Sequence, residues 1–415
     1  MKKTRNLLLN LLFLLVLGAG LSEARQIEVS PNGEIQALTE AIARADSGDT
    51  IILQEGRYLE ANVKIDKPLT IEGRGTAVID GEGKGFVLIV HASNVTLRNI
   101  EVHHAGTSFI EDYAGILVED VSNCLIENVK LVDNFFGIYL SKTSDSIIRN
   151  NTLIASGERE TQSGNGIHLW YSKNVKIEGN RVTGHRDGIY FEFVEDISIS
   201  GNTSENNLRY GLHFMFSDRC VYKENVFRDN GAGVAVMYTD EVEIVDNLFQ
   251  RNWGSAAYGL LLKEISESRV EGNRFEENSI GIYMESSGRN TVRNNDFQQN
   301  GWAIKLMANS MDNVFEKNNF IENTFDVATN SRQNFNEFNN NYWSHYEGYD
   351  LDRDGIGDVP YRPVRLFSIL VEKQPTALLL MRSMLIKVLD AAERFMPVLT
   401  PETLVDSSPK MRQIR

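Results

Sequence analysis

A repeat of about 22 residues is the feature of the sequence that most limits its fold. A short apolar motif recurs as AGILV, FGIYL, NGIHLW, DGIYFE, YGLHFM, AGVAVM, YGLLLK, IGIYME and WAIKLM, and Ala303 replaces the usual glycine in the last copy. Successive motifs are 22, 29, 22, 23, 22, 26, 22 and 22 residues apart. A series of asparagines from Asn180 to Asn295 is spaced by 22, 23, 22, 26 and 22 residues. Both series lengthen at the same place, which indicates a local insertion in one repeat.

This period is too short for repeats of paired helices and matches one turn of a β-solenoid. Each repeat holds two or three short strands separated by Asn, Gly and Asp corners, where residues tolerate a left-handed backbone. Stacked repeats bury a continuous apolar column, for example Ile189, Leu212 and Val234. We therefore predict an all-β fold, a right-handed parallel β-helix that runs from about residue 46 to 345.

The segments at the N-terminus predict an export signal and a cap. Residues 1–24 combine a basic start, a short apolar run and small residues before Ala24, as in a cleaved signal peptide, although an uncleaved anchor is the alternative. Farther on, Ile35, Leu38 and Ile42 share one face of a helix, which suits a cap over the open end of the solenoid. We expect residues 25–345 to form the capped β-helix of an exported protein.

Charge and cysteine content narrow the function further. The chain has a formal net charge of −15, and removal of residues 1–24 takes away three basic residues and one acidic residue, which leaves −17. Such a chain repels phosphate backbones, which argues against nucleic-acid binding.

The two cysteines, Cys124 and Cys220, align on the same inward position four coils apart, roughly 19 Å at ~4.8 Å per coil. This separation predicts buried thiols and no disulfide.

One outward face of the predicted helix carries an unusual set of side chains. The alternation of the strands places His213 and Met215 on the same side of YGLHFM, with Met237 on the next coil. The other residues predicted for this face are His168, Trp170, Tyr190 and Glu192. Imidazole and thioether together favour Cu(I), so we consider His213, Met215, Met237 and His168 as copper ligands on an exposed, transient site. The alternative is that they cover a flat sheet or form a protein interface without metal, with Trp170, Tyr190 and Glu192 at a partner face.

A second candidate site lies in YDLDRDGIGD, within an acidic loop at residues 346–361. Asp350, Asp352, Asp354 and Asp358 occupy offsets 1, 3, 5 and 9 of an EF-hand-like calcium loop. Position 12 is Tyr361 where a bidentate glutamate is needed, so a complete EF-hand is excluded. The loop therefore either binds Ca²⁺ with another ligand or only shapes a turn.

The tail, residues 362–415, changes from strand to helix periodicity. Between Ala377 and Met396, apolar residues recur at heptad spacing together with five charged residues, which disfavours a membrane span. A helix this apolar needs a partner. It either packs on the open C-terminal end of the solenoid or docks onto another protein or a membrane surface.

The strings NGIHLW, GHRDGIYFEF, LRYGLHFMFSD, DNGAGVAVMY and NNYWSHYEGYDLDRDGIGDVPYRP are together highly specific. Through them nearly the whole mature chain resembles the NosD family of periplasmic nitrous oxide reductase maturation proteins. The resemblance implies a periplasmic β-helix of the carbohydrate-binding type without known hydrolase activity. It implies that the protein works with the permease and the ATPase of an ABC transporter. The protein would then be held at the membrane surface only through this partner. It also implies two further partners, a copper-chaperone lipoprotein and nitrous oxide reductase. The protein would assist assembly of the copper–sulfur cluster of that enzyme, which acts in denitrification.

Two functions from different classes follow. The first is a periplasmic scaffold for copper-site assembly that has no catalytic residues and is not an enzyme. The second is a polysaccharide lyase, epimerase or hydrolase, since β-helices commonly bind polysaccharides along one face. His168, His185, Arg186, Asp187, Tyr190 and Glu192 would then supply acids, bases and a stacking platform. No paired carboxylates are evident on one strand face, and methionine beside histidine serves no sugar chemistry, which favours the first.

Overall fold

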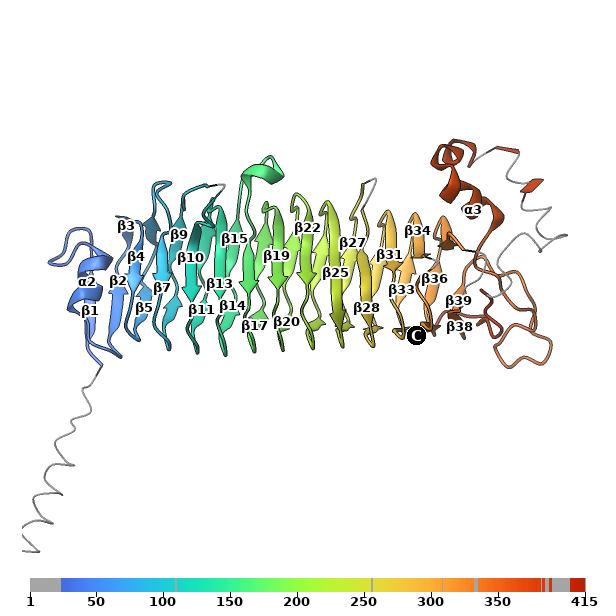
Figure 1. Ribbon diagram of the computed structural model, residues 1–415, viewed down its shortest axis with the longest axis horizontal. Coiled ribbons are helices and arrows are strands. Elements are labelled where there is room, and N and C mark those ends of the chain that lie inside the picture. Colours follow the sequence, from blue (N-terminus) through green and yellow to red (C-terminus); the bar gives the residue numbers. More distant parts are fainter. Residues whose placement is uncertain are drawn as a thin grey trace, which may run out of the picture.

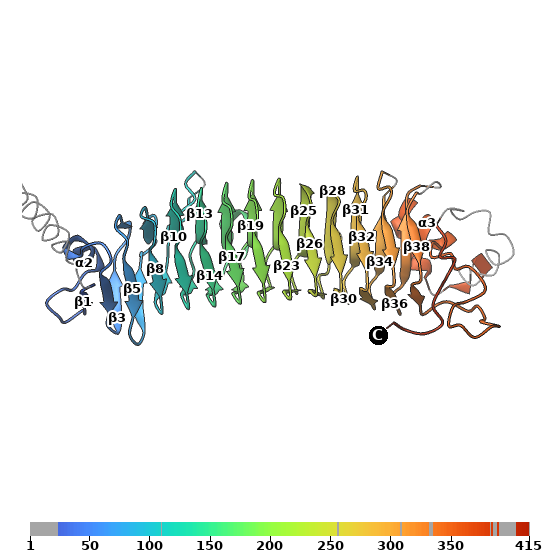
Figure 2. The same cartoon turned by 90° about the horizontal axis from the view of Figure 1, so that it is seen from below.

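The computed structural model is an elongated rod of stacked coils (Figures 1 and 2). It describes residues 24–108, 110–254, 257–307, 309–331, 335–381, 383–384, 388–389 and 404–414. The predicted signal peptide lies outside these residues, apart from Ala24. Among the described residues, none of the helices has the length and apolar character that a membrane span requires.

Three parallel sheets form the rod, and each coil adds one strand to each sheet, as a right-handed parallel β-helix requires. Within the described residues, sheet A has 14 strands, sheet B has 13 and sheet C has 12. Sheet A contains β1 (Gln26–Val29), β2 (Thr50–Leu53), β5 (Thr70–Gly73), β8 (Thr96–Arg98), β11 (Leu125–Glu127), β14 (Ile147–Arg149), β17 (Lys176–Glu178), β20 (Ser198–Ser200), β23 (Val221–Lys223), β26 (Glu243–Val245), β29 (Arg269–Glu271), β32 (Thr291–Arg293), β35 (Val314–Glu316) and β38 (Glu337–Asn339). The predicted fold class is confirmed.

The other two sheets complete each coil. Sheet B contains β3 (Gly56–Leu59), β6 (Ala77–Asp80), β9 (Glu101–His103), β12 (Lys130–Val132), β15 (Thr152–Ile154), β18 (Arg181–Thr183), β21 (Thr203–Glu205), β24 (Val226–Arg228), β27 (Leu248–Gln250), β30 (Arg274–Glu276), β33 (Asp296–Gln298), β36 (Asn319–Ile321) and β39 (Tyr342–Trp343). Sheet C contains β4 (Val63–Ile65), β7 (Leu88–Val90), β10 (Ala114–Glu119), β13 (Phe136–Ser141), β16 (Ile167–Trp170), β19 (Asp187–Glu192), β22 (Tyr210–Met215), β25 (Ala232–Asp240), β28 (Leu260–Ser266), β31 (Ile280–Glu285), β34 (Trp302–Leu306) and β37 (Phe325–Thr329).

The core is one apolar column that runs the length of the rod. Ile189 pairs with Leu212 and Leu212 with Val234, and all three are fully or almost fully buried, as the repeat predicts. Inward phenylalanines of sheet B stack face to face, with ring centroids of Phe249 and Phe275 4.7 Å apart at an angle of 4°. Cys124 and Cys220 are buried free thiols, in agreement with the alignment of the repeats.

Left-handed corners occur at Asn, Asp and Gly residues such as Asn150, Asp196 and Gly179, as predicted, but the periodic asparagines have another role. Asn180 and Asn202 are not in the left-handed region; the glycines before them, Gly179 and Gly201, have φ of 63°. The amide of Asn180 is buried, and its Nδ2 donates to Asn202 Oδ1 of the next coil (2.9 Å) and to the carbonyl of Ile148 (2.9 Å). The asparagines therefore satisfy buried backbone groups at the corner.

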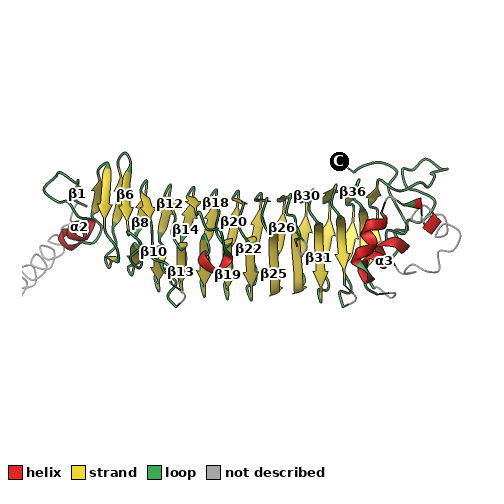
Figure 3. Ribbon diagram, turned by 90° about the horizontal axis from the view of Figure 1, so that it is seen from above, coloured by secondary structure: helices red, strands yellow, loops and turns green. Residues whose placement is uncertain are grey.

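Helices lie at the two ends of the described rod and in one insertion (Figure 3). α2 (Leu38–Arg44) covers the N-terminal end with Leu38 and Ile42 buried, which confirms the predicted cap. Strand β1 precedes this helix and pairs with β2, so the sheet begins before the predicted start at residue 46. η1 (Glu160–Gln162) lies in the insertion that lengthens one coil to 29 residues.

The first part of the tail packs on the last coil of sheet C. α3 (Leu366–Lys373) contacts β37 through Phe325 and Phe367, whose ring centroids are 5.9 Å apart, and Glu372 accepts from Lys305 Nζ (2.9 Å). η2 (Pro375–Leu380) follows. For α3 the structure thus shows packing on the end of the solenoid. Most of the residues between Met381 and Leu404 lie outside the described ranges, and docking of this segment on a permease stays a prediction.

The end of the tail is not helical, which corrects the prediction for residues 404–414. Asp406 forms bridges with Phe338 and Tyr361, and its carboxylate accepts from the backbone N–H and the side-chain Nδ2 of Asn341 (3.0 and 3.1 Å). Trp343 Nε1 donates to the same oxygen (3.0 Å). The buried carboxylate of Asp406 thus takes the place that an asparagine side chain would have in a further coil. It ends the column of hydrogen-bonded asparagine amides.

Candidate functional site

The outward side chains of sheet C form two neighbouring columns in the predicted order. Parallel register pairs His168 with Tyr190 and Tyr190 with His213. In the adjacent column, Glu192 pairs with Met215 and Met215 with Met237. Strands β16, β19, β22 and β25 therefore bring all the copper and partner-face candidates, including Trp170, onto four consecutive coils. The last three of these strands are labelled in the middle of the rod (Figure 1).

The two histidines are much less exposed than the sequence predicts. His168 is 9% exposed and His213 is 8% exposed, whereas Met215 and Met237 are partly exposed. The cause is an aromatic column: the His168 ring lies between Tyr139 and Tyr190, with centroid distances of 4.5 and 4.7 Å. The prediction that this face exposes its histidines and methionines is therefore wrong for the two imidazoles. The thioethers form the accessible part of the candidate site.

His213 is held by a buried ion pair that the sequence analysis missed. Asp187 is fully buried, and Arg209 Nε donates to its Oδ1 (2.8 Å). His213 Nδ1 lies 3.5 Å from Asp187 Oδ2 and 3.3 Å from a terminal nitrogen of Arg209. Burial alone raises the pKa of Asp187, but hydrogen bonds from Arg209 and His213 outweigh it and leave this pKa below its ordinary value. An ionised Asp187 favours a proton on Nδ1 of His213 and a lone pair on Nε2, whereas Arg209 can only donate to Nδ1, which places the proton on Nε2.

His168 is a weaker ligand candidate than His213. Arg186 donates to Asn165 Oδ1 (3.2 Å), which orients the amide so that Asn165 Nδ2 faces His168 Nδ1 (3.1 Å). Burial, with the charge of Arg186, lowers the pKa of His168 to about 3, so the ring is neutral. A neutral ring that accepts at Nδ1 carries its proton on Nε2. In this arrangement, neither nitrogen of His168 offers a free lone pair to a metal.

The thioether pair lies between opposite charges on neighbouring coils. Glu192 pairs with Met215 on one side, and Lys263 pairs with Met237 on the other. The Tyr190 hydroxyl donates to Glu192 Oε2 (3.3 Å), which keeps that carboxylate beside the column. Adjacent parallel strands are ~4.8 Å apart, a spacing at which two long thioethers can reach one ion together.

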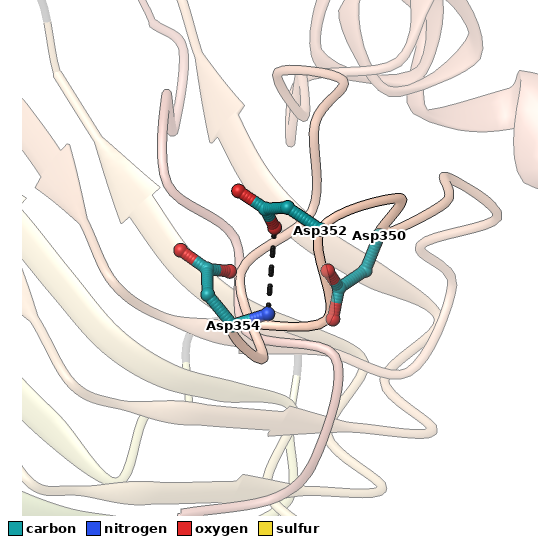
Figure 4. A group of neighbouring side chains, drawn as sticks. All are labelled: Asp350, Asp352 and Asp354. Atoms are coloured by element: carbon teal, nitrogen blue, oxygen red, sulfur yellow. Dashed lines mark hydrogen bonds between the residues drawn. The ribbon is translucent and has the colours of Figure 1, made fainter.

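The acidic loop gathers three of its four predicted ligands (Figure 4). Oxygens of Asp350, Asp352 and Asp354 lie within 4.8 Å of one another. Asp358 is not in the group, and its Oδ2 accepts from the N–H of Leu351 (2.7 Å). Asp350 also accepts from the N–H of Gly355 (3.0 Å), whose φ is +84°. These bonds fit the turn interpretation, and they leave other carboxylate oxygens for a cation.

Comparisons with known proteins agree on a family. The family model described as "Periplasmic copper-binding protein (NosD)" matches residues 42–161 and 152–348. "Probable ABC transporter binding protein NosD" of Pseudomonas aeruginosa is 31% identical over 421 aligned residues, covering 97% of this chain and 95% of the relative. The protein of the same name from Stutzerimonas stutzeri is 28% identical over 397 residues, covering 91% and 90%.

Solved structures share the fold at low sequence identity. The complex of XylC with xylose has a TM-score of 0.56 at 12% identity, covering 77% of this chain and 83% of that one. DFA-IIIase from Arthrobacter chlorophenolicus A6 in complex with GF2 has a TM-score of 0.55 at 17% identity, covering 69% and 93%. The Dettilon tailspike protein has a TM-score of 0.54 at 16% identity, covering 72% and 63%. These likenesses show the β-helix fold alone.

Proposed function

Because the chain belongs to the NosD family of periplasmic copper-binding proteins, we propose that it carries copper for the maturation of nitrous oxide reductase. It assists assembly of the copper–sulfur cluster in that enzyme and catalyses no reaction itself. The observation that carries the proposal is the pairing of Met215 with Met237 beside His213 on the outer face of sheet C. Copper is here a cargo that is received and released.

The chemistry of these side chains suits transient binding of Cu(I). Thioether and imidazole donors favour this soft ion, and thioethers bind Mg²⁺ and Ca²⁺ poorly. When the Nδ1 proton of His213 faces Asp187 Oδ2, 3.5 Å away, Nε2 is free to bind copper, as in metal-binding histidines that face a carboxylate. A thiolate would hold copper more tightly. Burial raises the pKa of Cys124 and raises that of Cys220 to about 12, so both thiols stay protonated and enclosed.

The carbohydrate-enzyme alternative has less support on this face. Burial and nearby carboxylates raise the pKa of Tyr139 and of Tyr190 to about 12, so neither phenol is a base near neutral pH. His185 is enclosed in the core, and burial lowers its pKa to about 4. Asp187 is fully buried and bound to Arg209. The acids and bases that the alternative needs are therefore neutral, enclosed or already paired.

The names of the relatives support an ABC transporter as a partner. We propose that the chain works in the periplasm with the permease and ATPase of such a transporter and with a copper-chaperone lipoprotein that supplies the metal. Its contact with the membrane is then made through the transporter. Export by a signal peptide at residues 1–24 belongs to the same proposal.

A Cu(I) competition titration tests the copper site directly. The purified mature protein competes for Cu(I) with a chromophoric chelator under reducing, anaerobic conditions. The variant Met215→Leu/Met237→Leu keeps side-chain volume but loses both thioethers, and we expect its Cu(I) affinity to fall at least about tenfold. Met311→Leu is the matched control, because Met311 is also exposed but lies far along the rod. Equal affinity of the double variant and the wild type rules out this thioether pair as the copper site.

The calcium prediction for the acidic loop is tested by thermal melting. If Asp350, Asp352 and Asp354 bind Ca²⁺, excess Ca²⁺ raises the melting temperature of the mature protein by mass action, and EDTA removes the effect. The variant Asp350→Asn/Asp352→Asn keeps an acceptor oxygen on each side chain but loses two charges, so its melting temperature should not respond. Identical wild-type melts in Ca²⁺ and in EDTA leave only the turn interpretation.

A further inference from the structure

A column of residues in the left-handed conformation lies near the C-terminal ends of the sheet C strands, directly after β10, β13, β16, β19, β22 and β31 and inside the longer β25 and β28. We call this position the corner. Eight positions in successive coils show it, with φ between 47° and 57°: Asp120, Lys142, Tyr171, Phe193, Phe216, Tyr238, Glu264 and Ser286. Backbone hydrogen bonds align the first five of them, Asp120 to Phe216, since each donates its N–H to the carbonyl before the corner of the next coil, as Phe193 does to Met215 (3.3 Å). Four consecutive positions are aromatic, and the positions on either side are charged.

The four aromatic side chains, Tyr171, Phe193, Phe216 and Tyr238, form what we call the aromatic ladder. Their rings stack in sequence with centroid distances of 4.8, 5.2 and 5.0 Å and interplanar angles of 23°, 11° and 11°. Tyr171 is 53% exposed, Phe193 38% and Phe216 41%. With coils ~4.8 Å apart, the ladder is an apolar strip about 14 Å long on the outside of the rod.

Stability does not explain the ladder. Bulky residues are strained in the left-handed region, and stacking of the rings offsets part of that strain, so the four rings bring no clear net stabilisation. The same corner is occupied by Asp120, Lys142, Glu264 and Ser286 in neighbouring coils at the same φ. The fold therefore does not require aromatic rings there, and a strip of exposed apolar side chains is characteristic of a binding surface.

The stacking geometry selects the kind of partner. Stacked rings cover one another's faces and present their edges to solvent, whereas a sugar packs on the face of a ring. A polysaccharide along the ladder would thus find no free faces between Tyr171 and Tyr238. Ring edges suit aliphatic side chains of another protein.

The charges beside the ladder indicate a cationic partner. The flanking positions of these four coils carry six carboxylates and two cations, namely Glu192, Glu195, Asp196, Asp218, Asp240, Glu241, Lys173 and Arg219. Arg219 is already paired with Glu195 (2.8 Å) and Asp196 (2.9 Å). This acidic border and a net charge of −15 disfavour a second copy of the chain and an anionic membrane.

The ladder adjoins the proposed copper site along the chain. Met215 directly precedes Phe216, and Met237 directly precedes Tyr238. We propose that the aromatic ladder docks the copper protein that receives metal from Met215 and Met237, the apo form of nitrous oxide reductase, through a cationic surface with exposed aliphatic side chains. The choice of partner rests on the proposed function. The ladder holds the acceptor site over the thioethers while copper is transferred.

Direct binding measurements test the proposal. The mature protein is titrated with purified apo nitrous oxide reductase of the same strain by surface-immobilised binding at low and high salt. In Phe193→Ser/Phe216→Ser, both rings are replaced by the residue that the corner holds at Ser286, and we expect affinity to fall at least about tenfold. Glu264→Ser changes the same corner outside the ladder and should bind as the wild type does. Wild-type affinity should fall as salt rises, because the acidic border is exposed.

A second variant keeps the test valid if the serine variant unfolds, which a circular dichroism melt reveals. Glu195→Lys/Asp240→Lys reverses two exposed charges beside the ladder and should weaken binding at low salt with all rings in place. Wild-type affinity in Phe193→Ser/Phe216→Ser overturns the ladder as the docking surface, and absence of binding by the wild type overturns the chosen partner. Cu(I) affinity measured by chelator competition should be unchanged in both variants, so loss of docking is distinguished from failure of the copper site.

Discussion

Replacement of Ile189 with aspartate is expected to abolish cooperative folding of the solenoid. Ile189 is fully buried and pairs with Ile167 on one side and Leu212 on the other, within the apolar column of sheet C. A carboxylate there has no partner, and an unpaired buried charge belongs to the few substitutions that cost about 4 kcal/mol or more. Each coil is stabilised by its two neighbours, so the disruption spreads along the stack.

A circular dichroism melt of the exported, purified variant measures the effect. Lys176→Asp serves as the control, because Lys176 is exposed on β17 of the preceding coil and places the same new carboxylate in water. The control should melt close to the wild type. A melt of Ile189→Asp that coincides with the wild-type curve contradicts the inward assignment of this column and, with it, the register of the whole repeat.

The register could be predicted because several features of the sequence agree. Strand alternation fixes which side chains share a face, and a shift by one residue would turn Ile189, Leu212 and Val234 outward together. The spacing of the repeats then assigns neighbours between coils, and the observed pairs agree. The same reasoning placed Cys124 and Cys220 apart.

Accessibility on the outer face could not be predicted in this way. Alternation places His168 and His213 outward, but their burial depends on tyrosine rings from adjacent coils packing over them. The Arg209–Asp187 ion pair joins residues 22 positions apart, and nothing in either local sequence signals it. The aromatic ladder left a visible signal, because Tyr171, Phe193, Phe216 and Tyr238 recur at spacings of 22, 23 and 22 directly after a strand motif.

The ends of the rod were the least predictable parts. The change from strand to helix periodicity after Tyr361 correctly indicated helix early in the tail, where α3 packs on Phe325. Most of the heptad segment from Ala377 to Met396 lies outside the described residues. The periodicity gave no indication that Asp406 returns to the last coil and accepts hydrogen bonds from Asn341 and Trp343. The last asparagine of the buried column needs a hydrogen-bond acceptor beyond it, and Asp406 supplies one. This need arises only once the solenoid has folded.

Loss of the candidate copper site should leave nitrous oxide reductase without its copper. The variant His213→Ala/Met215→Ala/Met237→Ala removes the imidazole beside Asp187 and both thioethers, so none of these three proposed copper donors remains on sheet C. In a strain that depends on this protein for its nitrous oxide reductase, the enzyme should then be as poor in copper and activity as in a strain that lacks the protein. Copper content is measured by elemental analysis of the purified enzyme.

Two controls separate the site from the scaffold in this experiment. The periplasmic level of the variant must match the wild type by immunoblot, and its melt must stay cooperative, because removal of His213 leaves space beside Tyr190 and Tyr210 in the aromatic column. Met311→Ala, an exposed methionine on a distant coil, should mature the enzyme normally. If the triple variant is exported and folded and the enzyme still holds its full copper content, copper does not pass through these residues. His213 and the two methionines then serve only to cover the sheet or to contact a partner.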